Sequence, residues 1–553
     1  MQKSNFVNVI ITFLIGILCS CTKSMYESSP KINNKIQYAS SSISTVSSAL
    51  QCTAEAEQTN YSIYKMCSDG TRIGDIAPYY DSIAGNSKFY YLKNIWNDPG
   101  QKHPWFGFVT NDFYNYTETG AIIPSNENTC AQDNSIGAGS ILKSNGIYYA
   151  FYTGHNPNVA NCANSVKTEG IMLATSTSPS SGFTKDTAFT TIYAPAGIGF
   201  DENDNWRDPF VMWDATNGNW MMILMARKNQ SGTWMGVIVK YTSADLLNWT
   251  YQGVFYDGGG TNYFNMECPG LFKIGNYYYL TFSDQSINSN AYKYVHYRKS
   301  ISLNGPWILP SGSDRIDGNA FYAGKAMTDI YGDSYLLGWS HTLSGNTDSG
   351  AYVWGGNLIA HKMYPLSNGD LAVCIPHTVK DWLETNQVAF TKNSQWGNVT
   401  KTDSTAESYR LVSNADFNVA NVLYNPISNT QYMITTMVSY NSSSKDFGFF
   451  IGACDGYENT YQLRFVPSQN KFKYETNPRS KVDSTSSVND VPILLAPNTN
   501  YKVQIIIEHS VVVVYINDQI AFTNRIYKAP NTTWGIFSDH SDVIFSDITV
   551  TGP

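Results

Sequence analysis

Three acidic residues open similar stretches of this sequence. Asp75, Asp208 and Glu267 each begin a short apolar run that leads through a turn into an aromatic-rich segment. If the three stretches are equivalent units of one fold, their carboxylates converge. Converging carboxylates in a pocket lined by aromatic side chains are typical of glycosidic bond cleavage, in which one carboxyl group protonates the leaving oxygen and another stands behind the anomeric carbon. We therefore predict that Asp75, Asp208 and Glu267 are catalytic.

The same pattern of apolar run, turn and aromatic strand occurs five times. The five copies lie at residues 75–92, 137–152, 208–223, 267–280 and 321–338, and the second and fifth lack an acid. A β-hairpin unit that recurs roughly every 50 to 70 residues cannot bury its own apolar face and has to stack on its neighbours, as the blades of a propeller do. The sequence predicts a five-bladed β-propeller in which equivalent positions meet at the central axis.

The last third of the chain has a different pattern. Short alternating strands separated by polar turns favour a β-sandwich. The clearest strands are 431–437, 461–465, 501–507 and 511–515, with 534–539 and 543–549 as a closing strand pair. We predict an all-β chain with the propeller at 69–380, a linker at 381–395 and the sandwich at 396–553.

Composition limits the partners. Aromatic residues make up 14% of the 553 residues, charged residues another 14%, and the formal net charge is −8. Tyr, Trp and Phe favour strands and can stack on sugar rings. Nucleic-acid binding needs clustered Lys and Arg, which this chain lacks, so we expect a saccharide partner and no nucleic acid.

The N-terminus indicates where the protein works. After Lys3, residues 6–18 form an apolar segment suited to a signal-peptide core. It ends in Leu18-Cys19-Ser20-Cys21, which resembles a bacterial lipoprotein cleavage box. We predict a signal at 1–21 with lipidated Cys21, a flexible tether at 22–68, and a lipid-anchored protein of the bacterial cell envelope, on the periplasmic or outer-membrane face. An ordinary secretory signal is the alternative.

Nine cysteines bear on redox state and metal binding. Cys52 with Cys67, and Cys130 with Cys162, are candidate disulfide pairs in an oxidising compartment. The sequence has no CxxC or HExxH spacing of the kind that binds zinc. We predict no metal and no organic cofactor.

Two motifs in order carry a family resemblance. Arg207-Asp208-Pro209 and Glu267-Cys268, followed by Trp354-Gly355-Gly356 and a C-terminal sandwich, resemble glycoside hydrolase family 32, the invertases, inulinases and levanases. The resemblance runs from about residue 70 to the C-terminus. It implies retaining cleavage of β-fructofuranosidic bonds in inulin, levan or sucrose. It further implies that Asp75 is the nucleophile, that Asp208 stabilises the transition state, and that Glu267 is the general acid and base.

The first motif departs from the family pattern. The family has Trp-Met-Asn-Asp-Pro-Asn-Gly, and the nearest string here is Trp96-Asn97-Asp98-Pro99-Gly100. Asp98, however, follows its aromatic strand, whereas Asp208 and Glu267 precede theirs. Asp75 also precedes its strand, so we favour Asp75 and interpret Asn97-Asp98-Pro99 as a turn.

Four further residues are predicted to bind substrate. Arg207 either donates to sugar hydroxyls or forms a salt bridge. Trp105 lies where the family has a pocket tryptophan, with core packing as the alternative, and Ser140 resembles a family serine near the pocket. Cys268 would form an apolar wall beside Glu267, whose pKa we expect burial and like charge to raise. We place His155 and Asn156 outside the site.

Two rival functions remain open at this point. An inverting five-bladed glycosidase similar to family 43, acting on arabinan or xylan, would also use two Asp and one Glu, spaced more widely to admit a water. A non-catalytic glycan-binding lipoprotein would use the same scaffold. The sequence decides neither the choice among sucrose, inulin and levan nor exo against endo action, because loops around the pocket determine both.

Overall fold

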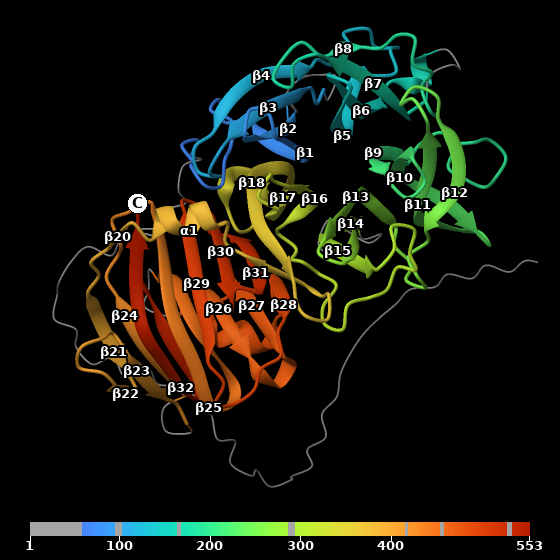
Figure 1. Ribbon diagram of the computed structural model, residues 1–553. Coiled ribbons are helices and arrows are strands. Elements are labelled where there is room, and N and C mark those ends of the chain that lie inside the picture. The colour runs from blue at the N-terminus through green and yellow to red at the C-terminus, as the bar shows by residue number, and fades with distance from the viewer. Residues whose placement is uncertain are drawn as a thin grey trace, which may run out of the picture. The chain divides into compact units, whose positions relative to one another are not determined.

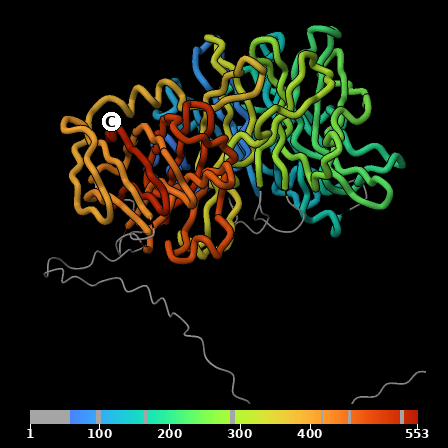
Figure 2. Tube along the Cα trace, turned by 90° about the horizontal axis from the view of Figure 1, so that it is seen from below, coloured from blue at the N-terminus to red at the C-terminus, as the bar shows by residue number. Residues whose placement is uncertain are grey.

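The computed structural model describes residues 58–94, 102–162, 167–285, 293–414, 418–453, 458–527 and 533–553. Within these ranges the chain is almost entirely β-structure (Figure 1). Strands up to residue 374 form five blades, and those from about residue 386 form a sandwich, coloured orange to red in Figure 2. The predicted all-β architecture is confirmed.

The five blades follow one another along the chain. Blade 1 contains β1 (Arg72–Asp81), β2 (Asn86–Asn94), β3 (Trp105–Thr110) and β4 (Thr117–Ile123). Blade 2 contains β5 (Ser135–Ser144), β6 (Ile147–His155), β7 (Glu169–Ser176) and β8 (Thr184–Lys185). Blade 3 contains β9 (Trp206–Asp214), β10 (Asn219–Gln230), β11 (Thr233–Ser243) and β12 (Thr250–Tyr256). Blade 4 contains β13 (Asn265–Ile274), β14 (Tyr277–Gln285) and β15 (Lys293–Ser300). Blade 5 contains β16 (Tyr322–Thr328), β17 (Ser334–Leu343), β18 (Tyr352–Pro365) and β19 (Leu371–Cys374).

The first strand of each blade is the innermost one. β1, β5, β9, β13 and β16 contact one another in a closed ring, and Figure 1 shows them facing a common centre. Blade 5 also joins blade 1 directly, because β18 pairs with β1 at Gly356 and Ile73. The prediction of five blades around one axis is therefore confirmed.

Every innermost strand carries a β-bulge at the same level. The interruptions in pairing fall between Gly74 and Ile76, Ile136 and Gly139, Arg207 and Phe210, Glu267 and Gly270, and Tyr322 and Lys325. A bulge leaves a residue unpaired and re-aims its side chain. At this level of the channel, the side chains of all five innermost strands therefore depart from the regular alternation between the two faces of a sheet.

The sandwich follows helix α1 (His377–Leu383). Its strands are β20 (Asn386–Gln387), β21 (Lys392–Trp396), β22 (Asn398–Lys401), β23 (Tyr409–Val412), β24 (Val419–Tyr424), β25 (Gln431–Ala453), β26 (Tyr461–Val466), β27 (Lys471–Glu475), β28 (Asn489–Pro492), β29 (Tyr501–Glu508), β30 (Val511–Ile516), β31 (Ile520–Arg525) and β32 (Thr533–Gly552). Short 3-10 turns lie at Val159–Asn161, Ser344–Asn346, Pro467–Gln469 and Arg479–Ser484.

One predicted feature of the sandwich is wrong. Residues 534–539 and 543–549 are not two paired strands but parts of the single 20-residue strand β32, which pairs with β24 and with the 23-residue strand β25. Several register shifts in the β25–β32 pairing let both strands bend and continue. Residues 540–542, which separate the two predicted strands, lie within this bent region.

The predicted tether is too long at its carboxyl end. Tyr61, Ile63, Tyr64, Met66 and Cys67 are all buried in the core that the blades share with sandwich strands. The Glu508 carboxylate accepts hydrogen bonds from the backbone N–H groups of residues 62, 63 and 64. The alternation of aromatic and aliphatic residues gave this segment enough apolar area to pack.

The two predicted disulfides have different outcomes. Cys130 and Cys162 form a disulfide. Cys67 is a buried free thiol that donates to the Tyr91 hydroxyl, so the pairing proposed with Cys52, which lies outside the described residues, is not formed. Within the described ranges, no helix is long and apolar enough to cross a membrane.

Candidate active site

The three predicted acids line one cavity in the propeller. Asp75, Asp208, Glu267 and the predicted Arg207 all face a space of about 450 Å³ at one end of the channel. Its wall also includes His103, His155, Glu169, Gln285, Lys293, Tyr322 and Trp354. The repeats along the sequence thus bring together side chains from all five blades. Asp98, the rival of Asp75, lies outside the described residues.

The bulges explain how the acids are aimed. Asp75 and Asp208 are bulged residues of β1 and β9, and Asp208 adopts the left-handed conformation with φ 61°. Cys268 and Ala323 occupy the same position on β13 and β16 and have φ values of 49° and 54°. Non-glycine residues rarely adopt this conformation, and it persists where surrounding structure enforces it, often at functional sites.

Glu267 occupies a different register position from the two aspartates. It is the last paired residue before its bulge, and its equivalents are Gly74, Ile136, Arg207 and Tyr322 on the other innermost strands. The expectation that all three acids are equivalent is therefore wrong by one residue. Residues at this level, and not the two aspartates, supply the direct hydrogen-bond partners of Glu267.

Glu267 is held by two of its four equivalents. The Arg207 guanidinium donates from Nη2 to Oε1 at 2.6 Å, and the Tyr322 hydroxyl donates to Oε2. Burial acts to raise the pKa of Glu267, but the Arg207 charge, the Tyr322 hydrogen bond and the Lys293 charge outweigh it, so the pKa is lowered. The predicted raised pKa of this acid is thus wrong for the site without substrate.

Arg207 itself is anchored from the opposite side. Its Nη1 donates to Glu169 Oε1 at 3.1 Å, and the other Glu169 oxygen accepts the backbone N–H of Trp206 at 2.8 Å. Burial acts to raise the pKa of Glu169, but Arg207 and His155 outweigh it and lower the pKa to about 2. Arg207 therefore forms the salt bridge that the sequence left as an alternative, with one carboxylate on each side.

The two aspartates have the opposite electrostatics. Burial raises the pKa of Asp75, whose Oδ1 accepts the Trp339 indole N–H at 3.0 Å. Burial also raises the pKa of Asp208 to about 7, and the Asp75 charge adds to the effect against the opposing Arg207 charge. The Asp208 carboxylate accepts the backbone N–H of Cys268 at 2.8 Å. Removing these two carboxyl groups from water therefore costs free energy.

The other three predicted substrate-binding residues lie behind the cavity wall. Trp105 is 1% exposed, and its indole N–H donates to the Gly137 carbonyl at 3.0 Å. Cys268 is 2% exposed and holds Asp208 through its backbone. The Ser140 hydroxyl accepts the backbone N–H of Val211, and Ser140 lines a second cavity deeper in the channel. None of the three lines the cavity that contains the acids.

Several residues of the cavity were not predicted. His155 was placed outside the site but lines the cavity, with Nδ1 3.8 Å from Glu169 Oε1. Tyr322 carried a usable signal, because it directly precedes the fifth repeat's bulge as Glu267 precedes the fourth. Glu169 and Lys293 begin β7 and β15, which are not innermost strands, so the repeat alignment could not find them.

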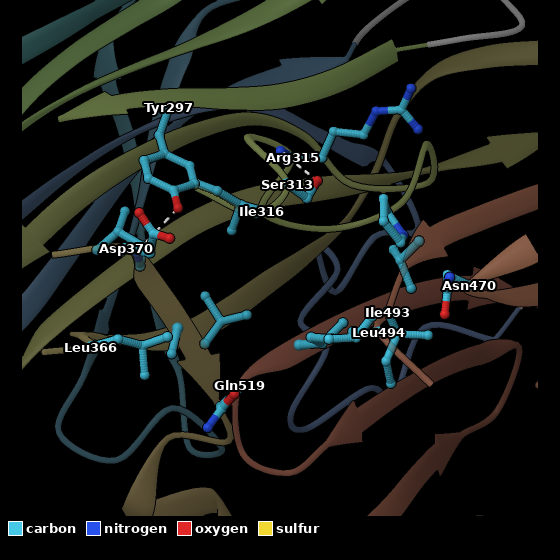
Figure 3. A pocket seen from close by; sticks show the side chains of 17 residues that line it. Tyr297, Ser313, Arg315, Ile316, Leu366, Asp370, Asn470, Ile493, Leu494 and Gln519 are labelled. Carbon is cyan, nitrogen blue, oxygen red and sulfur yellow. Dashed lines mark hydrogen bonds between the residues drawn. The ribbon is translucent and has the colours of Figure 1, made fainter. Parts of the chain in front are cut away.

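A larger cavity of about 560 Å³ has a different character (Figure 3). Apolar side chains from blade 5 and the sandwich, including Leu366, Ile493 and Leu494, make up much of its lining. Its one carboxylate, Asp370, is committed to Lys299 at 2.6 Å and to Ser311. Asp370 is the one acid among the described residues that line this cavity, so the chemistry of the chain is placed in the smaller cavity.

Family models match nearly the whole described chain. The glycosyl hydrolases family 32 N-terminal domain matches residues 79–371. The chain belongs to glycoside hydrolase family 32. The sandwich matches the GH32, BT1760-like, C-terminal domain over residues 369–550. The first match begins after Asp75, so the assignment to the family does not depend on that residue.

Characterised relatives agree with this assignment. The chain is 22% identical to the raffinose invertase of Escherichia coli over 75% of this chain and 79% of the relative. It is 26% identical to an E. coli sucrose-6-phosphate hydrolase over 45% of this chain and 51% of the relative. A levanbiose-producing levanase of Geobacillus stearothermophilus is 27% identical over 34% of this chain and 43% of the relative. The protein is a glycoside hydrolase that acts on β-fructosides, and the rival with family 43 chemistry is set aside.

Solved structures agree with the fold. Sucrose-6-phosphate hydrolase from Lactobacillus gasseri superposes with a TM-score of 0.65 at 16% identity, over 90% of this chain and 93% of that chain. Fructan 1-exohydrolase IIa from Cichorium intybus gives the same TM-score and identity over 90% of this chain and 98% of that chain. At such identities the likeness supports the architecture and not the substrate.

Proposed function

We propose that the protein hydrolyses β-fructofuranosidic bonds of inulin, levan or sucrose with retention of configuration. The observation that carries the proposal is the shared cavity of Asp75, Asp208 and Glu267. Asp75 is the nucleophile, Glu267 is the general acid and base, and Asp208 holds fructose hydroxyls in the transition state. The invertase and levanase activities named for the relatives support fructosides as the substrate class.

The chemistry follows from the two kinds of carboxyl group. The Asp75 carboxylate attacks the anomeric carbon and forms a fructosyl-enzyme, while Glu267 protonates the departing oxygen. Glu267 then takes a proton from the water that releases fructose. The Trp339 indole N–H fixes one oxygen of Asp75 and leaves the other for attack.

Glu267 has to gain a proton before it can act as an acid. Arg207 and Tyr322 favour its ionised form before substrate binds. We propose that fructose hydroxyls compete for the Arg207 N–H groups and weaken its bond to Glu267. Glu169 keeps the other side of the guanidinium in place meanwhile. The pKa of Glu267 then rises toward the range of a general acid.

Product analysis tests this function. Purified protein is incubated with sucrose, inulin and levan, and with arabinan and xylan as controls, and the anomer first released is followed by NMR. We expect β-fructose from at least one fructoside and no pentose. An inverted first product or pentose release would contradict the proposal. Because no metal or organic cofactor is invoked, the rate should be unchanged in excess chelator.

We further propose that the chain is a lipid-anchored protein of the bacterial cell envelope. The support is the Leu18-Cys19-Ser20-Cys21 string after an apolar segment. Full-length protein should partition with membranes, and Cys21→Ala should release it or block its maturation, whereas Cys19→Ala serves as the matched control. A wild-type protein that is wholly soluble with a mature N-terminus other than residue 21 would contradict the anchor.

A further inference from the structure

A lysine lies buried on the innermost strand of blade 5. Lys325 is 1% exposed, and its ammonium donates to the Gly139 carbonyl on β5 at 2.6 Å. Lys325 is the first residue to pair again after the bulge of β16. Its equivalents on the other innermost strands are Ile76, Gly139, Phe210 and Gly270. Lys325 is thus the one charged side chain among the five described residues at this level.

The level of Lys325 is one step deeper than that of the aspartates. Residues at and before the bulges line the cavity that holds the acids. Residues after the bulges, including Gly139, Ser140, Phe210 and Lys325, line a second cavity of about 260 Å³. Lys325 therefore lines the second cavity, one step past the bulges that contain Asp75 and Asp208.

The remaining charges around the aspartates have other partners. Arg207 binds Glu169 and Glu267, and its Nε is 3.9 Å from Asp208. Lys293 donates to the Tyr352 hydroxyl at 3.2 Å. The titratable and charged groups that interact with Asp75 or Asp208 from the packed strands are Glu267, Cys268, Arg207, Lys293, Lys325 and Tyr352, whereas Tyr322 faces Glu267.

We propose that Lys325 is a positioning residue of the reaction: a buried cation, one level past the bulges, that favours the ionised forms of Asp75 and Asp208. The inference rests on the proposed function, in which Asp75 has to be a carboxylate to attack. A buried carboxylate without a nearby cation takes up a proton instead. Burial already raises the pKa values of Asp75 and Asp208, and the Lys325 charge opposes that rise for both.

The test separates the charge of Lys325 from its hydrogen bond. Lys325→Gln keeps a donor for the Gly139 carbonyl but has no charge, whereas Lys325→Met has neither. Lys299→Gln is the matched control, because Lys299 is also a buried lysine, is paired with Asp370, and lies away from the acids. Initial rates are measured against pH with 4-nitrophenyl β-fructofuranoside, whose activated leaving group needs little help from Glu267.

We expect the acidic limb of kcat/KM to move up by about 1 pH unit or more in both Lys325 variants, as for loss of a nearby opposite charge. The loss should lie in kcat, should shrink as pH rises, and should not occur in Lys299→Gln. An unshifted limb in Lys325→Gln would overturn the proposal. Failure of both Lys325 variants to fold would overturn it too, because the cation would then be structural.

A second readout needs no substrate and separates this inference from the proposed function. Carboxyl groups whose pKa is raised by folding lose stability as pH rises above their unfolded values. Lys325→Gln should therefore lose more thermal stability than wild type between pH 4 and pH 8. A wild type that releases no fructose, together with this steeper loss, would refute the function but keep the electrostatic role. An unchanged slope would refute the role itself.

Discussion

Buried charge is handled in two ways in this molecule. In the sandwich, Arg464 donates to Asp446 at 2.5 Å and to Glu475 at 2.6 Å, and Arg479 bridges Asp446 and Asp539. None of these five side chains lines any of the cavities described above. In the propeller, Asp75, Asp208 and Glu267 share one cavity, in which Arg207 donates a hydrogen bond to Glu267 and has its Nε 3.9 Å from Asp208.

The difference shows what each cluster does for the protein. Each sandwich carboxylate faces a guanidinium, which offsets the cost of removing both charges from water. Asp75 and Asp208 have neutral N–H donors instead, and burial raises their pKa values. Burial raises the pKa of Glu475 in the sandwich cluster as well, so the two clusters differ in the partners of their carboxylates and not in burial. The carboxylates of the cavity keep their charge for a substrate, at a cost in stability.

Removal of the nucleophile should give the largest effect. Asp75→Asn keeps the shape of the bulge but abolishes attack, so turnover of sucrose or inulin should fall by about 10⁴-fold or more. Asp98→Asn is the control and should cost little. Initial rates on folded variants decide between them. An active Asp75→Asn beside an inactive Asp98→Asn would show that Asp98, and not Asp75, is the nucleophile.

Removal of the acid should give a smaller loss that depends on the leaving group. Glu267→Gln loses protonation of the departing oxygen, worth about 10²–10⁴-fold on sucrose. On 4-nitrophenyl β-fructofuranoside the loss in the first step should be much smaller, because the leaving group needs no proton. Burst kinetics on the two substrates measure the difference. Equal losses on both would assign Glu267 another role.

Replacement of Asp208 should lower turnover and, at high pH, raise stability. Asp208→Asn loses transition-state contacts, so turnover should fall by about 10²–10³-fold. The folded-state pKa of Asp208 is raised to about 7, so the wild-type residue costs stability increasingly as pH rises from about 4 to about 7.

The variant should therefore melt higher than wild type at pH 8, by roughly 2–4 °C, with no gain at pH 4. Thermal unfolding at the two pH values measures this. A variant that melts lower at pH 8 would show that the Asp208 charge stabilises the fold, as the sandwich charges do.

The sandwich cluster should respond in the opposite sense. Asp446→Asn leaves Arg464 and Arg479 with too few carboxylates, and loss of one partner in a buried ionic cluster costs about 3–5 kcal/mol. The free energy of unfolding in urea should drop by that amount, while kcat/KM on sucrose stays within about twofold. A loss of activity in folded Asp446→Asn would break the separation of the two clusters.

The repeats predicted the blades because hairpin periodicity reflects backbone packing. The repeats also placed Asp75 and Asp208 together, since both begin their strands at the bulge. They misaligned Glu267 by one residue because a bulge inserts a residue that strand alternation does not reveal. Glu169 and Lys293 approach from the second and third strands of their blades, and only the tertiary structure brings them to the acids.

The smallest expected effect concerns Trp105, for which the sequence left pocket lining and core packing open. Its indole is buried and donates to the Gly137 carbonyl beside the cavity wall. Trp105→Phe removes that donor and should lower the free energy of unfolding by about 1–3 kcal/mol, with KM changed by less than about threefold.

Trp354→Phe is the contrasting variant, because Trp354 lines the cavity and stacks on His103. It should raise KM for inulin with little change in stability. If instead Trp105→Phe raises KM and leaves stability intact, the indole reaches the sugar in the complex. Trp105 would then be part of the substrate-binding surface and not of the wall behind it.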